Sequence, residues 1–335
     1  MKIGLFCLSE HFGGTVTESI ADQLRLVELA DELGFDEAWL GEHHFNGFSV
    51  IPDPAVMIAY AAARTKQIRL GTAGFLAPFY HPVRLAESIA VLDQISGGRI
   101  NAGFAKGGFA PDNKHFNRDP DDLRQAMFET VEAVDDLLHA DNISAKGEFV
   151  SFGQVTIKPK PLQQHLPIFV ATFSNPDTIR FAARRGYGLL FSQGASLTEC
   201  LEAQRLYASL AGFNPEIVLM RVFCVAETTE SAYRTARPAV DHFVKSMRAV
   251  SAEKMQPAWN RQNYDAILRE REAFFDGRNF IDQGVIGTPQ KCLDTLNTIR
   301  RALPDVHLIL KPSSADPGQN RAMLYAFNTK IRPQL

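Results

Sequence analysis

A glutamate and two histidines follow directly after a strand-like apolar segment near the start of the chain. The run is Glu42-His43-His44-Phe45, and the segment before it covers 37–41. Three interpretations are open for the histidines: metal ligation, a structural hydrogen bond, or proton donation and transfer at a cavity. Neighbouring strand residues point to opposite faces, so His43 and His44 are poorly placed to share one metal ion. We expect no metal here and treat Glu42, His43 and His44 as candidate catalytic residues, with a structural role still open for His44.

Three further segments have residue types that suit a flat ligand with an anionic end. Small residues dominate 71–75, which lets either a flat ligand or another backbone approach closely. Glycines flank Lys106 within 103–108, a pattern typical of an anion-binding turn or of a flexible turn. A helix should begin within 172–176, where free N–H groups can bind phosphate. Asp177 could satisfy the same donors, so an ordinary capped helix remains open there.

Strand-like and helix-like segments alternate along the 335 residues. Strands separated by helices favour parallel pairing, and eight such units can close into a (β/α)₈ TIM barrel. We therefore expect one α/β domain over 1–335, with the candidate residues at the carboxyl ends of the strands. The predicted strands cover 2–8, 37–41, 68–76, 100–104, 168–171, 188–192, 217–226 and 306–310.

Three segments depart from the simple alternation. Residues 146–161 alternate aromatic or aliphatic side chains with polar ones, which predicts a hairpin inserted before the fifth strand. Residues 250–283 form a long charged insertion before the last βα unit, expected to be a mobile lid or else a docked surface helix. The helix over 55–63 is apolar all round, which favours a subunit interface, so we expect a homodimer, or else cover by a loop of the same chain.

Composition excludes several classes of protein. Forty-five per cent hydrophobic and 22 per cent charged residues are typical of a folded globular chain, and the net charge of −3 gives no global attraction to nucleic acid or to a membrane surface. The four cysteines are far apart, which predicts neither a disulfide scaffold nor a zinc site and fits a reducing compartment. No apolar run is long enough to span a bilayer. We therefore expect a cytoplasmic protein.

Taken together, these motifs resemble the bacterial luciferase family of flavin-dependent monooxygenases, and the luciferase α subunit in particular. In order along the chain, the resemblance rests on Met1-Lys2-Ile3-Gly4, Glu42-His43-His44-Phe45, Gly71-Thr72-Ala73, His81-Pro82-Val83-Arg84, the run from Leu92 to Arg99, Asn101-x-Gly103, and Ile286-Gly287-Thr288-Pro289-Gln290-x-Cys292. Each motif is weak alone, but their order and spacing together make a strong signal.

The resemblance implies a site for reduced FMN (FMNH₂) at the strand carboxyl ends, where O₂ is activated as a flavin C4a-(hydro)peroxide. His43 would support and protect that species, and Ala73-Gly74 would form a non-proline cis peptide behind the flavin ring. The flavin phosphate would bind Lys106, which stands where the family has an arginine, and Ser174 at the start of a helix. Ser192 would lie near the ring.

Besides Lys106, two positions depart from the family pattern. Ala105 replaces the reactive cysteine of luciferase, and Phe173 replaces a glutamate. The substrate-facing positions are not recognisably those of a light emitter, so we expect no light emission, but an FMNH₂-dependent monooxygenase that oxygenates a small organic substrate. No G-x-G-x-x-G follows the first strand, so a separate NAD(P)H:flavin reductase should supply the reduced flavin. The alternatives are hydride transfer with a deazaflavin and flavin binding without turnover.

Overall fold

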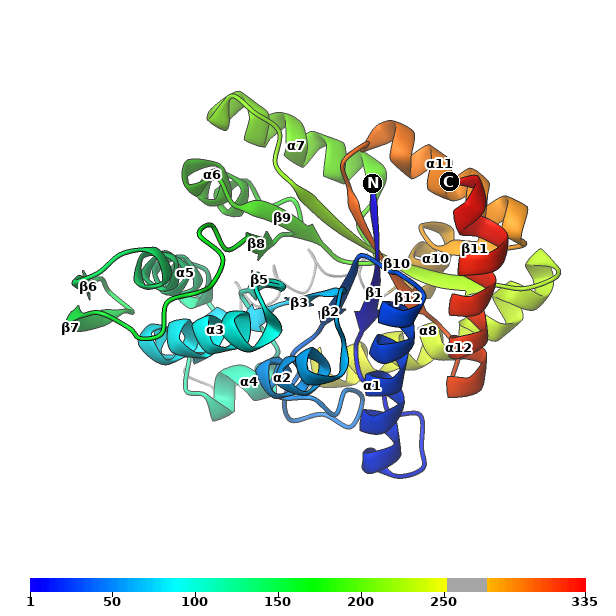
Figure 1. Ribbon diagram of the computed structural model, residues 1–335, viewed down its shortest axis with the longest axis horizontal. Helices are drawn as coiled ribbons and strands as arrows, with labels where there is room; N and C mark the ends of the chain where they lie inside the picture. The colour runs from blue at the N-terminus through cyan, green and yellow to red at the C-terminus, as the bar shows by residue number, and fades with distance from the viewer. Residues whose placement is uncertain (252–275) are drawn as a thin grey trace.

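The computed structural model describes residues 1–251 and 276–335. Within them, parallel strands close into a barrel with helices around it, which confirms the predicted (β/α)₈ fold (Figure 1). Closure is made by β12 pairing with β1 and by β9 pairing with β10. The barrel strands are β1 (Lys2–Cys7), β2 (Glu37–Leu40), β3 (Arg69–Thr72), β5 (Ile100–Ala105), β8 (Ile168–Ala171), β9 (Gly188–Phe191), β10 (Ile217–Val225) and β12 (His307–Pro312).

Side-chain caps fix where most of the surrounding helices begin. Thr15 and Ser196 each form a capping box with the glutamate three residues on, and Asp53, Asn175, Thr288 and Asp316 accept hydrogen bonds from first-turn amides. The longer helices are α1 (Val16–Glu32), α2 (Pro54–Arg64), α3 (Pro82–Ser96), α5 (Leu123–His139), α6 (Pro176–Arg185), α7 (Leu197–Ala211), α8 (Thr229–Ser251), α11 (Pro289–Ala302) and α12 (Pro317–Ala326). The shorter ones are α4 (Ala110–His115) and α10 (Gly277–Asp282). In the part of the chain that the structure describes, no helix is both long and apolar enough to cross a membrane.

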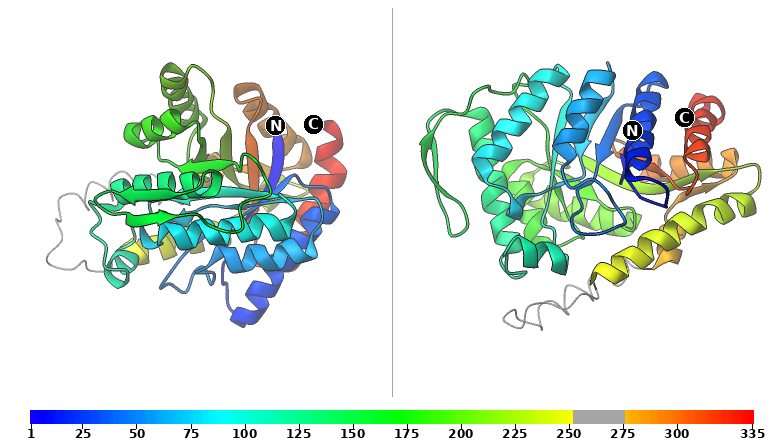
Figure 2. Two further views of the ribbon diagram at one scale, coloured as in Figure 1. Left: turned by 60° about the vertical axis from the view of Figure 1, so that its left-hand side comes forward. Right: turned by 90° about the horizontal axis from the view of Figure 1, so that it is seen from below.

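The structure describes the first of the two predicted insertions and only the ends of the second. The first is an antiparallel hairpin of β6 (Ile143–Lys146) and β7 (Ser151–Val155) beside α5, as predicted, although it begins three residues earlier than 146 (Figures 1 and 2). Residues 252–275 of the second lie outside the described part, and so does the predicted lid.

Two strand predictions need correction. The predicted strand over 68–76 is divided into β3 and β4 (Phe75–Leu76), because a cis peptide bond between Ala73 and Gly74 turns the chain. A further strand, β11 (Val285–Gly287), pairs with β10 outside the closed barrel. A strand of three residues is too short to be recognised from the sequence, particularly directly before the helix start at Thr288.

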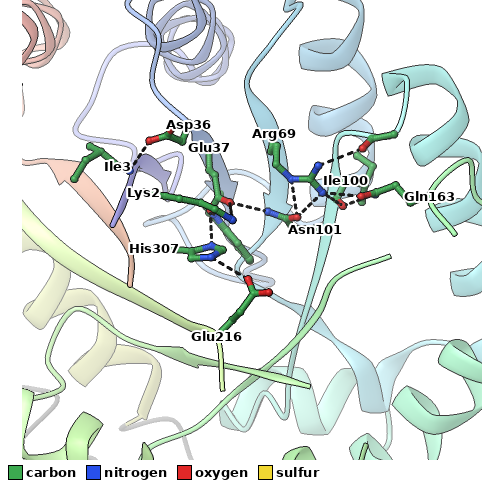
Figure 3. Close-up of polar contacts among 12 residues, drawn as sticks. Lys2, Ile3, Asp36, Glu37, Arg69, Ile100, Asn101, Gln163, Glu216 and His307 are labelled. Atoms are coloured by element: carbon green, nitrogen blue, oxygen red, sulfur yellow. Dashed lines mark hydrogen bonds and ion pairs between the residues drawn. The ribbon is translucent and has the colours of Figure 1, made fainter. Parts of the chain in front are cut away.

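A buried polar network lies at the amino-terminal ends of the strands (Figure 3). Glu37 is 0 % exposed and accepts hydrogen bonds from Trp39 and Asn101. His307 lies between two carboxylates, with Nδ1 3.1 Å from Glu37 and Nε2 3.0 Å from Glu216. Burial opposes protonation of His307, but these two partners outweigh it and raise the pKa of the imidazole. Because this end of a barrel serves stability, we assign the network to folding.

Helix α2 is covered on one side only. Met57, Ile58 and Ala61 pack into the core, whereas Val56 is 65 % and Tyr60 51 % exposed. Neighbouring α3 also presents large apolar side chains to solvent. We define the α2–α3 apolar face as Val56, Tyr60, Val91 and Ile95. The face is the kind of patch that a subunit interface covers, and the predicted dimer stays a prediction.

Candidate functional site

A largely apolar cavity lies at the carboxyl ends of the barrel strands, where active sites of this fold are found. Six of the eight residues predicted from the sequence line it: Glu42, His43, Ala73, Gly74, Lys106 and Ser192. His44 and Ser174 are not among the lining residues. Their neighbours in the sequence are: Glu42 and His43 come just before His44, and Phe173 and Asn175 flank Ser174. The fold therefore brings most of the candidate residues to one place from strands far apart in the sequence.

His43 is a neutral group in this cavity. Burial first, and then the nearby charges of His44 and Lys311, lower the pKa of its imidazole to about 4. The rings of Phe48 and Phe109 lie 5.9 and 6.1 Å from the His43 ring. At neutral pH the side chain therefore offers one N–H donor and one nitrogen acceptor in an apolar setting.

Glu42 has both of its carboxylate oxygens engaged. Oε1 lies 2.7 Å from His44 Nε2, and Oε2 accepts from the Tyr80 hydroxyl at 2.8 Å and the Leu76 amide at 3.2 Å. Burial raises the pKa of Glu42, and these donors counteract the shift. The contacts tie the end of β2 to the segment after β4, so Glu42 and His44 hold the wall in which His43 sits.

The cis peptide bond between Ala73 and Gly74 forms part of the cavity wall. A Cβ on Gly74 would lie 2.8 Å from backbone atoms of Gly103 and Phe104, so the two strands can meet only where no side chain intervenes. Thr72 fixes this approach, since its hydroxyl donates to Gly103 O at 2.7 Å and accepts from Gly103 N at 2.9 Å. At these two positions the wall carries no side chain larger than the Ala73 methyl, which suits the close approach of a planar ring.

Two cationic side chains line the cavity, and one of them, Arg124, lies by the start of α6. Arg124 Nη1 donates to Thr178 Oγ1 at 2.7 Å, and both residues line the cavity together with Lys106. The helix is capped by Asn175, which accepts from the amides of Asp177 and Thr178, and not by Ser174. A helix start with an arginine beside it is suited to an anion such as a phosphate, and Lys106 adds a second cationic side chain to the cavity lining.

Arg124 and Gln193 were not predicted from the sequence. One local signal could have pointed to Arg124. It lies in the first turn of α5, where the helix dipole disfavours a positive charge, so a cation at this position suggests a role other than helix stability. Gln193 has no such signal. Its buried Oε1 and the buried Oγ of Ser192 have no hydrogen-bond partner in the described structure, and both residues line the cavity. Buried polar atoms without partners are uncommon, and these two belong to residues of the cavity wall.

No group of three or more His, Cys, Asp or Glu side chains is arranged to hold a metal ion in residues 1–251 and 276–335. The site combines an apolar cavity, a wall of backbone without large side chains at Ala73 and Gly74, a neutral histidine and two cationic side chains. Such a site at the top of a (β/α)₈ barrel is suited to a planar cofactor with an anionic group.

Comparison with known proteins identifies the family within this class. Residues 1–305 match the luciferase-like monooxygenase family, and the chain belongs to it. The α chain of alkanal monooxygenase from Photobacterium leiognathi is 25 % identical over 352 residues, covering 100 % of this chain and 99 % of that one. The oxygenase component of the flavin-dependent trigonelline monooxygenase from Acinetobacter baylyi is 32 % identical over 248 residues, covering 69 % and 67 %.

Solved structures give the same assignment. Monooxygenase RslO1 from Streptomyces bottropensis superposes with a TM-score of 0.85 at 29 % identity, covering 100 % of this chain and 99 % of that one. An F420-dependent secondary alcohol dehydrogenase superposes with a TM-score of 0.76 at 18 % identity, covering 99 % and 98 %. The second likeness shows only that the fold is shared.

Proposed function

We propose that the protein is an FMNH₂-dependent monooxygenase that inserts one oxygen atom from O₂ into a small organic substrate and releases the other as water. The observation that supports this most directly is the combination, in one cavity, of the flat Ala73–Gly74 wall with the cationic side chains Lys106 and Arg124. The first suits an isoalloxazine ring and the second suits a phosphate. When bound, the reduced flavin supplies the two electrons and the reaction with O₂.

The chain's own residues bind and orient this cofactor. In the proposed arrangement the phosphate lies against Lys106, Arg124 and Thr178, within one helical turn of Ser174. The Ala73 side of the cavity carries the ring, and Ser192 and Gln193 turn their unpartnered oxygens toward its polar edge.

His43 is proposed to hold a proton at one ring nitrogen beside the reacting part of the flavin. Because its pKa is about 4, it remains neutral and brings no charge into the cavity at physiological pH. Glu42 and His44 keep the end of β2 in place, and are proposed to act through His43 rather than on the substrate. The apolar lining, which includes Phe109 and Met220, excludes water that would otherwise divert the reaction to hydrogen peroxide.

The proposed partners are O₂, an organic substrate, a second copy of the chain and a separate NAD(P)H:flavin reductase. The relative from Acinetobacter baylyi is described as an oxygenase component, which supports a divided system of this kind. The second copy would cover the α2–α3 apolar face. All four cysteines are unpaired and buried, in keeping with the proposed cytoplasmic location.

Deazaflavin-dependent hydride transfer is the second candidate, since an F420-dependent dehydrogenase shares the fold. One experiment separates the possibilities. The purified protein is titrated with FMN, riboflavin and a deazaflavin, and reduced FMN is then mixed with O₂ and a substrate panel under mass spectrometry. We expect tighter binding of FMN than of riboflavin, and a product heavier by one oxygen atom that takes up ¹⁸O from ¹⁸O₂. Preference for the deazaflavin without oxygen incorporation would favour hydride transfer, and flavin binding without any product would favour a binding protein.

A further inference from the structure

A buried arginine holds the loop that carries Ser192 and Gln193. Arg221 lies on β10 and is 1 % exposed, while its neighbour Met220 lines the cavity. Because adjacent strand residues point to opposite faces, the Arg221 side chain runs away from the cavity, toward the loop between β9 and α7.

The partners of the Arg221 guanidinium are backbone carbonyl oxygens. Nη2 donates to Ala195 O at 2.6 Å, and Nη1 donates to Met220 O at 2.9 Å and to Gln193 O at 3.5 Å. Within the described residues Arg221 forms no ion pair. Burial lowers its pKa to about 10, which leaves it charged at neutral pH. A desolvated charge held only by main-chain oxygens is costly, so its position calls for a specific reason.

The loop is held from a second direction by α10. Asn279 Nδ2 donates to Gly194 O at 2.9 Å, so the carbonyls of three successive loop residues each have a side-chain donor. Gly194 also lies close to α10, since a Cβ there would be 2.9 Å from the Phe280 ring. The first two residues of this loop, Ser192 and Gln193, line the cavity, and each has a buried side-chain oxygen without a partner in the described structure.

We propose that Arg221 and Asn279 are positioning residues that orient Ser192 and Gln193 toward the polar edge of the bound flavin ring. Three carbonyls fixed by side chains leave the loop little freedom, so the Ser192 and Gln193 oxygens are held ready before the ligand arrives. Lysine cannot replace Arg221 in this role, because its compact ammonium cannot span separate carbonyls as the planar guanidinium does. The inference rests on the proposed flavin-binding function and extends it to residues outside the cavity.

The test compares FMN and riboflavin binding in Arg221→Lys and Asn279→Leu, by flavin fluorescence and by the visible absorption band of the bound ring. Both variants should weaken FMN and riboflavin by the same factor, about five- to tenfold, as expected for losing one neutral hydrogen bond at the ring. Their bound-flavin spectra should move toward that of free flavin, and Ser192→Ala should reproduce the spectral change. The matched control is Arg99→Lys, because Arg99 also donates to backbone carbonyls, those of Ala62 and Ile68, at the opposite end of the barrel. It should lower the melting temperature and leave both flavin affinities and the spectrum unchanged.

The outcomes distinguish a failure of the proposed function from a failure of the positioning role of Arg221 and Asn279. If the wild-type protein binds no flavin, the proposed function fails and this inference fails with it. If the wild type binds flavin, folded Arg221→Lys and Asn279→Leu variants with unchanged affinity and spectrum would overturn the inference alone. A loss confined to FMN would also overturn it, since the effect would then be at the phosphate. Should Arg221→Lys not fold, the half-buried Asn279 still provides the comparison, because its replacement leaves the buried charge in place.

Discussion

Replacing Arg124 with methionine tests whether the cationic end of the cavity binds a phosphate. The change removes the guanidinium that donates to Thr178 at 2.7 Å and keeps an unbranched apolar side chain in place. A hydrogen bond to a charged group contributes about 1.5–3 kcal/mol. The FMN dissociation constant should therefore rise by about ten- to 150-fold, with the lower figure expected because Arg124 is only half-buried. Riboflavin has the same ring and no phosphate, so its affinity should change little.

Fluorescence titration with both flavins measures the difference, and repeating it in high salt should reduce the FMN preference, since partly exposed charges are screened. Arg180→Met is the matched control, on α6 two residues after Thr178, the residue that Arg124 of α5 contacts. Arg180 pairs with Asp177 in solvent, with side chains 54 % and 66 % exposed, and such a pair contributes little. Equal losses for FMN and riboflavin in Arg124→Met, or the same loss in Arg180→Met, would refute the assignment of the phosphate to this end.

Three other predictions concern separate parts of the molecule. His43→Ala should keep the fold but divert turnover to hydrogen peroxide, measured as peroxide formed per product; unchanged coupling would contradict the proposed role. Val56→Glu or Tyr60→Glu should convert a dimer to monomers by burying a carboxylate in the α2–α3 apolar face, as measured by light scattering; a monomeric wild type would remove the prediction. His307→Gln should destabilise the fold by about 3–5 kcal/mol in urea unfolding, as expected for breaking a buried ion pair.

The last prediction carries a definite pH dependence. The folded-state pKa of His307 is raised, so its contribution to stability is fully present below the unfolded-state value near 6.5 and is lost as pH rises through the folded-state pKa. The difference in unfolding free energy between wild type and His307→Gln should therefore shrink on the alkaline side of pH 6.5. A difference that grew with pH would show that the imidazole is neutral between its two carboxylates.

Predictions from sequence succeeded where the signal is local. The barrel strands follow from apolar runs bounded by turns and helices, and the hairpin of β6 and β7 follows from alternation around Gly153. The cis bond at Ala73–Gly74, by contrast, was expected from resemblance and not from pattern. Small residues at this point are equally typical of close packing and of ligand approach, and the structure shows packing of Gly74 on Gly103 beside the cavity.

The residues that sequence analysis missed act through contacts between distant segments. Arg124 meets Thr178 across 54 positions, and Arg221 meets Ala195 across 26, so no periodicity or short motif connects them. At the start of α6 the sequence offers both Ser174 and Asn175 as a cap, and the structure shows that Asn175 takes that place. Ser174 has a positive φ of 59°, which turns the chain from β8 into α6. The motif thus predicts a helix start after this strand, whereas the choice between neighbouring side chains depends on how the backbone turns there.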